Sequence, residues 1–147
     1  MPVPDRVRTE AIDRFWETVP PLWGMIRSRI RASATADFGI TVEQFQVLRY
    51  VRRGIDSMSD LAGAKNISRP AISQAVEVLV QKRLLRHTHS TADRRCVNLA
   101  LTKKGDALLD ALFGRTRSWM AERMHSMTID ELQIIAGAMD ALKKMLP

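Results

Sequence analysis

Residues 57–83 read SMSDLAGAKNISRPAISQAVEVLVQKR, and this stretch carries the signals of two short helices separated by a tight turn. A serine at position 57 or 59 can cap the first helix, which we expect over about residues 59–65. Asn66 follows, and asparagine tolerates left-handed backbone. Ser68 can cap the second helix, whose first turn accepts Pro70. Two helices joined in this way form a helix-turn-helix.

The second helix has one apolar and one polar face. The positions expected to face the core are Ile72, Ala75, Val76, Leu79 and Val80. The outer positions are Arg69, Ser73, Gln74 and Glu77. Such a helix fits the major groove of B-DNA, where arginine can bind guanine, glutamine can bind adenine and serine is permissive. Any soluble helix also has a polar face, so this motif alone leaves DNA binding and a plain surface helix both open.

A β-hairpin is predicted directly after the second helix. Residues 85–89 and 95–101 have the composition of strands, and the residues between them are rich in turn formers. Arg94 and Arg95 lie near the predicted tip, where guanidinium groups suit the minor groove, and Asp93 can brace one of them. A solvent-exposed hairpin with a local ion pair is the alternative. The strand residues expected to point inward are Val97, Leu99 and Leu101.

The net charge of +7 is concentrated in the same segment. Residues 65–104 hold nine basic and two acidic side chains, whereas the rest of the chain holds fourteen of each. Protein surfaces normally mix both signs, so this concentration favours a polyanion as the partner, and nucleic acid is the commonest one.

The flanking segments are predicted to be helical. Residues 5–19 form an amphipathic helix that Pro20-Pro21 should end or kink, and a second helix should then run to about residue 36. Capping boxes begin further helices at Thr41 and Thr128, and Thr102 can cap a long helix.

The last helix, residues 129–146, carries two apolar lines, which is more than a small monomer can cover. We therefore expect the two chain ends to form a homodimer, because symmetric dimers are the commonest oligomers. A helix buried within its own core is the alternative.

Three stretches resemble the MarR family of transcriptional regulators. TVEQFQVLRYV resembles the family's second helix, SDLAGAKNISRPAISQAVEVLVQKRLL its helix-turn-helix and ADRRCVNLALTKKG its wing, with the Asp-x-Arg and Leu-Thr-x-x-Gly patterns. The resemblance runs from about residue 20 to the end. It implies a mainly α fold with a small β-hairpin, in which residues 41–101 form a winged helix-turn-helix lobe and residues 1–40 and 102–147 form a helical dimerisation region.

The resemblance also implies a function. A homodimer would bind a pseudo-palindromic operator in double-stranded DNA, as a repressor released by a ligand or by oxidation. In the wing, Arg95 matches the family's arginine, Asp93 its orienting partner, and Arg94 is a neighbouring candidate. The residues that match the family's recognition helix are Ser68, Arg69, Pro70, Ser73 and Gln74.

Two positions depart from the family's pattern. Arg83 stands where such sequences have a glycine that ends the recognition helix. The Pro20-Pro21 pair indicates an extra N-terminal helix.

Other candidate sites are weaker. The resemblance places a pocket for a small aromatic or amphipathic effector near Trp23, Ile26 and Phe45. Cys96 lies beside an arginine, which lowers a thiol pKa, but we expect a plain strand residue there. His87 and His89 lack the further ligands of a metal site, so we expect no metal. No nucleophile triad, phosphate loop or paired-carboxylate motif occurs, so we expect neither an enzyme nor a cofactor.

The composition sets the remaining limits. With 147 residues, 46% hydrophobic and 27% charged, the chain is typical of a globular protein of one domain. One cysteine excludes an internal disulfide, and no apolar run approaches the ~20 residues of a membrane span. The N-terminus MPVPDRVRTEAIDRF has no signal-peptide pattern. We expect a cytoplasmic regulator; the alternatives are a non-specific architectural DNA-binding protein and a winged helix that docks a protein partner.

Overall fold

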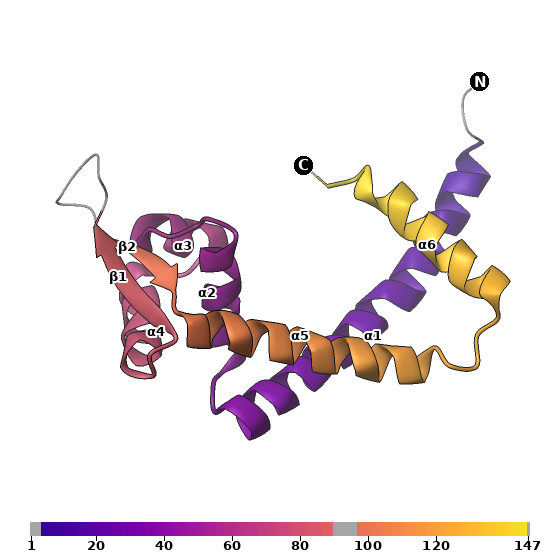
Figure 1. Cartoon of the computed structure of the whole chain (residues 1–147). Helices are drawn as coiled ribbons and strands as arrows, with labels where there is room; N and C mark the ends of the chain where they lie inside the picture. The colour runs from indigo at the N-terminus through magenta and orange to yellow at the C-terminus, as the bar shows by residue number, and fades with distance from the viewer. Residues whose placement is uncertain (1–3, 90–96, 147) are drawn as a thin grey trace. The chain divides into compact units, whose positions relative to one another are not determined.

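The computed structural model describes residues 4–89 and 97–146 (Figure 1). Its elements are α1 (Asp5–Phe38), α2 (Val42–Arg52), α3 (Met58–Lys65), α4 (Arg69–Gln81), β1 (Leu85–His89), β2 (Val97–Leu101), α5 (Lys103–Arg123) and α6 (Ile129–Lys143). The chain divides into two compact units, Met1–Thr116 and Arg117–Pro147, so α5 begins in the first and ends in the second. The predicted fold class, mainly α with a small β-hairpin, is confirmed.

Helix α1 runs without interruption through Pro20 and Pro21, so the predicted break and the separate N-terminal helix are wrong. A proline inside a helix lacks the N–H group that would bond to the carbonyl four residues earlier. Here those carbonyls belong to Trp16 and Glu17, and both residues are exposed. Water can therefore satisfy the two freed acceptors, which removes part of the cost of keeping the helix continuous.

Both predicted capping boxes are present. The side chain of Thr41 accepts a hydrogen bond from the backbone N–H of Gln44, and the side chain of Gln44 accepts one from the backbone N–H of Thr41, each at 3.1 Å. Thr128 and Glu131 exchange the same pair of bonds, at 3.2 and 2.8 Å. Each box satisfies two amides that a helix start leaves without a partner.

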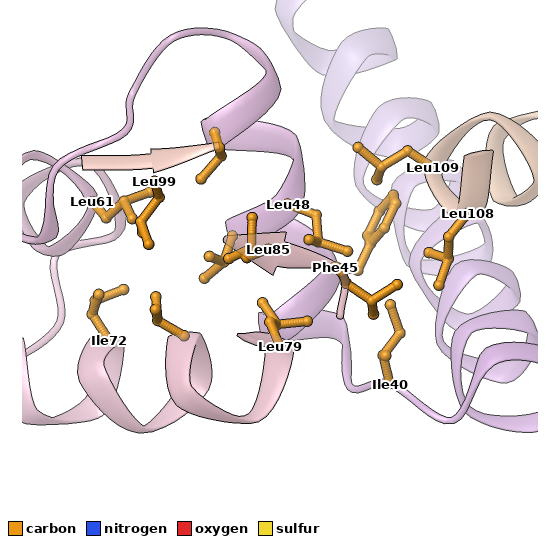
Figure 2. Packing of buried hydrophobic residues seen from close by; sticks show 14 of the residues in the cluster. Ile40, Phe45, Leu48, Leu61, Ile72, Leu79, Leu85, Leu99, Leu108 and Leu109 are labelled. Atoms are coloured by element: carbon orange, nitrogen blue, oxygen red, sulfur yellow. The ribbon is translucent and has the colours of Figure 1, made fainter. Parts of the chain in front are cut away.

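The core of the first unit lies where α2, α4, the hairpin and the start of α5 meet (Figure 2). Each of these elements contributes a fully buried side chain: Phe45 and Leu48 from α2, Leu79 from α4, Leu85 from β1 and Leu109 from α5. Burying one such side chain contributes roughly 1.5–3 kcal/mol, so the apolar face of α4 is firmly held.

The hairpin pairs β1 with β2 in antiparallel register, with Leu85 opposite Leu101 and His89 opposite Val97. Leu99 is buried and Leu101 half-buried, as predicted. Val97 is 42% exposed, so its inward prediction is wrong. The alternating pattern places Val97 on the core-facing side, but it pairs at the far end of the hairpin, away from the apolar side chains that surround Leu85.

The second unit contains the end of α5 and helix α6. Helix α6 buries none of its residues. Within the part of the chain that the structure describes, none of the helices combines the length and the apolar content that crossing a lipid bilayer requires.

Candidate nucleic-acid interface

Helices α3 and α4 form the predicted helix-turn-helix. The hydroxyl of Ser57, and not that of Ser59, caps α3 by accepting a backbone hydrogen bond at 3.1 Å. Helix α3 ends at Asn66, whose φ of 52° lies in the left-handed region. The hydroxyl of Ser68 then caps α4 at 3.4 Å, and Pro70 lies in the first turn. The turn therefore forms through the residue types that the sequence supplies for it.

The two faces of α4 are separated as predicted. Ile72, Val76 and Leu79 are buried, whereas Ala75 and Val80 are partly buried against the same core. The recognition-helix residues singled out from the sequence are all exposed, and they lie within the first two turns: Ser68, Arg69, Pro70, Ser73 and Gln74. The structure thus places these side chains together on a helix whose opposite face is fixed in the core.

The end of α4 is joined to the start of α5. Arg83 adopts a φ of 60°, the left-handed conformation that glycine adopts most easily, so the arginine takes the conformation expected of a glycine at this position. Its carbonyl accepts a hydrogen bond from the hydroxyl of Thr102 at 2.6 Å. The backbone N–H of Thr102 donates to the carbonyl of Leu84 at 3.2 Å. The side-chain hydroxyl of Thr102 also accepts a hydrogen bond from the backbone N–H of Gly105 at 3.0 Å, which is the predicted cap of α5.

Several cations of the basic segment are engaged in structural contacts. The ammonium of Lys82 donates to the carbonyl of Gly39 at 2.7 Å, and that of Lys104 donates to the carbonyl of Lys82 at 3.2 Å. The ammonium of Lys65 donates to the side-chain carbonyl of Gln46. Burial lowers the pKa of Lys65, and the nearby carboxylate of Glu43 partly opposes that shift. Charge counting along the sequence could not separate these lysines from freely exposed ones.

The remaining candidates fall into two groups. The predicted wing residues Asp93, Arg94 and Arg95, together with Cys96, lie outside the described residues. His87 and His89 are exposed on β1. In residues 4–89 and 97–146, no group of three or more His, Cys, Asp or Glu side chains is arranged to hold a metal ion.

The three predicted pocket residues come from two helices. Phe45 of α2 lies in the core, where its ring packs edge-on against that of Phe113 with centroids 5.7 Å apart. On α1, Trp23 is 49% exposed and Ile26 is half-buried.

Comparison with known proteins shows similarity to one family. Residues 38–95 match the model of the MarR family. The HTH-type transcriptional repressor MdtR of Bacillus subtilis is 30% identical to this chain over 95 residues, which is 64% of this chain and 61% of MdtR. The match therefore spans less than two thirds of that relative's length.

Solved structures extend the likeness in fold. A MarR family protein from Bacillus stearothermophilus superposes with a TM-score of 0.81 at 14% identity, covering 94% of this chain and 96% of that chain. FabT from Streptococcus pneumoniae, solved in complex with DNA, superposes with a TM-score of 0.71 at 16% identity, covering 92% and 96%. The resemblance of this chain to the MarR family is therefore confirmed, in sequence over residues 38–95 and in fold over more than nine tenths of its length.

Proposed function

We propose that this chain is a sequence-specific DNA-binding transcriptional regulator that acts as a homodimer in the cytoplasm. The observation that carries the proposal is α4, where Arg69, Ser73 and Gln74 are exposed opposite a face that is buried in the core. A rigid helix of this kind fits the major groove. The proposal is supported by the excess positive charge of residues 65–104 and by the fold shared with FabT, which was solved on DNA.

The candidate residues of the recognition helix have separate proposed tasks. Arg69 binds guanine with two hydrogen bonds, Gln74 binds adenine, and Ser73 contacts either base. Ser68 and Pro70 set the start of the helix. The N–H of Ala71 donates to Ser68, and Pro70 has no N–H. The backbone N–H of Arg69 is therefore the amide of this turn proposed to bind a DNA phosphate.

The wing supplies a second contact in this proposal. Arg95, with Arg94 beside it, enters the minor groove, whose negative potential attracts guanidinium groups, and Asp93 orients Arg95. These roles rest on the family's Asp-x-Arg pattern in the sequence.

The dimer is proposed to form through residues 1–40 and 102–147, with a second copy of this chain as the partner. Ile129 and Ile134 of α6, and Met145 just after it, are at least 70% exposed, and α1 leaves Trp16 67% exposed. Apolar side chains in this number are costly in water, and a two-fold dimer covers the same surface on both copies. Two α4 helices then reach half-sites about 10 bp apart on one side of a duplex.

We further propose that the regulator is a repressor released by a small aromatic or amphipathic effector. MdtR, which shares 30% identity over 95 residues, is a transcriptional repressor. Trp23, Ile26 and Phe45 are the proposed lining residues of the effector pocket, as the family resemblance implies. Trp23 and Ile26 supply apolar surface on α1, whereas Phe45 is buried in the core of the single chain.

The proposal is tested by selecting bound sequences from a random duplex pool and measuring competition by random DNA. A regulator should enrich a two-fold symmetric motif and prefer it by roughly 10³ or more. Arg95→Ala should weaken binding strongly while leaving the fold intact. Unchanged binding by that variant would remove the role of Arg95.

Two other functions give different results. A non-specific architectural protein would bind random DNA as tightly as any selected sequence. A winged helix that docks a protein would bind its partner with little dependence on salt, whereas phosphate contacts release counterions and make binding strongly salt-dependent.

A further inference from the structure

Glu77 is an acidic side chain on the exposed face of the basic helix-turn-helix. It is the one acidic residue in the sequence of α4, and it lies one turn beyond Ser73. Both side chains are exposed. None of the ion pairs within the described residues involves Glu77. A carboxylate in this place would be repelled by DNA phosphates, so any favourable contact with DNA must be with a hydrogen-bond donor on a base.

The side chain of Glu77 borders a hollow beside α4. Together with Ser73 and Gln81, it lines a hollow of about 370 Å³ to which His87 of β1 also contributes. Figure 1 shows α4 beside β1 in this part of the chain. Ser73, Glu77 and Gln81 are spaced by four residues and therefore form one polar row along the helix.

The distance between Ser73 and Glu77 can be expressed in base pairs. Four residues of α-helix rise about 6 Å, and base pairs are spaced about 3.4 Å apart, so Glu77 lies at most about two base pairs from Ser73 along the DNA axis when α4 occupies a major groove. An ionised carboxylate can only accept hydrogen bonds. Guanine presents two acceptors in the major groove, thymine presents one, and adenine places its N7 acceptor beside its amino group. Cytosine presents its N4 amino donor with an acceptor, guanine O6, on one side only, whereas the adenine amino group lies between two acceptors.

We propose that Glu77 is a specificity-determining residue that selects cytosine at one position of each half-site and lowers the affinity for unrelated DNA. The inference rests on the proposed function and adds a residue to it. The carboxylate accepts from the cytosine N4 amino group, and it repels the acceptor atoms of the other bases and the phosphates of a misaligned duplex. The basic segment supplies attraction, and Glu77 makes that attraction depend on sequence.

The test compares four proteins by selection from a random duplex pool: the wild type, Glu77→Gln, Glu77→Ala and the control Glu43→Gln. Glu43 is an exposed residue of α2, so its variant matches the charge change of Glu77→Gln outside both α4 and the proposed dimerisation region. The wild type and the control should select cytosine at the position in question. Glu77→Gln should shift the preference to adenine, and Glu77→Ala should lose it, with discrimination between bases changing about 5- to 150-fold. Both variants at Glu77 should bind random duplex DNA more tightly than the control.

Three outcomes overturn the inference. If both variants select the wild-type motif with unchanged base frequencies, Glu77 does not read a base. If they lower the melting temperature and weaken binding to all sequences equally, Glu77 stabilises the fold instead. If the wild type itself selects no motif, the proposed function fails together with this inference, whereas the first two outcomes leave the proposed function standing.

Discussion

An ideal Cβ atom on Gly105 would lie 2.1 Å from the carbonyl oxygen of Leu84. Gly105 therefore permits the start of α5 to approach the backbone that follows α4, and this contact gives a physical reason for the glycine of the Leu-Thr-x-x-Gly pattern. The obstacle is a backbone carbonyl, which cannot rotate away as a flexible side chain can.

Gly105→Ala should lower the free energy of unfolding by about 2–3 kcal/mol, because the methyl group forces the two backbones apart. Gly114→Ala is the matched control. Gly114 lies in the same helix, and a Cβ atom there would meet nothing within 4 Å. The control should raise stability by about 0.5–1 kcal/mol through helix propensity. Urea unfolding at one protein concentration measures both. Equal effects of the two substitutions would show that the contact with Leu84 is not tight.

Arg83→Gly should stabilise the fold by about 1 kcal/mol, because a non-glycine residue with a φ of 60° is strained. Arg83→Ala removes the same charge and keeps the strain, so it separates the two effects. Thermal unfolding should rank glycine above arginine, with alanine close to arginine. A glycine variant no more stable than the alanine variant would contradict the strain.

Gln74→Ala should cost about 1–3 kcal/mol on a selected operator and relax the preference at one base position. Because Gln74 carries no charge, the slope of log affinity against log salt should stay at the wild-type value. Fluorescence anisotropy over a salt series measures both quantities. A uniform loss on all sequences would argue against base reading by Gln74.

Ile134→Glu should weaken the proposed dimer strongly, because it places a charge on a side chain that is 70% exposed in the single chain and would be buried by a partner. Gln133→Glu adds the same charge at the neighbouring exposed position and serves as the control. Sedimentation equilibrium at micromolar concentration measures the association. A wild type that sediments as a monomer would refute dimerisation outright.

The lowered pKa of Lys65 predicts a pH dependence of stability. Burial of the ammonium places its folded pKa below the ordinary value of 10.5, so the unfolded chain binds more protons between the two values. Stability from this group should therefore rise as the pH increases through that window, and the burial cost is fully present at lower pH. Lys65→Met should lack the rise. Parallel pH profiles of wild type and variant would contradict the assignment.

The sequence predicted best what depends on neighbouring residues. The boxes at Thr41 and Thr128, the cap at Ser68 and the left-handed Asn66 all formed as expected, because each needs only a few adjacent side chains. The two faces of α4 followed from helical spacing for the same reason.

Features that depend on surroundings were harder to predict. The break expected at Pro20-Pro21 did not occur. The exposure of Trp16 and Glu17, whose carbonyls the prolines leave without a donor, is not visible in a local pattern. Val97 has the inward position in the alternating pattern of its strand, yet it is 42% exposed because it lies beyond the core. Lys65 and Lys82 count as free charges in the sequence but hydrogen-bond to other parts of the fold. The wing arginines stay a prediction.

The hydrogen bonds that Thr102 makes with Arg83, Leu84 and Gly105 have a mechanical consequence. They tie the residues that follow α4 to the first turn of α5. These bonds couple α4 to the beginning of α5, so we expect a tilt imposed on α5 near Gly105 to change the direction of the side chains of Arg69 and Gln74.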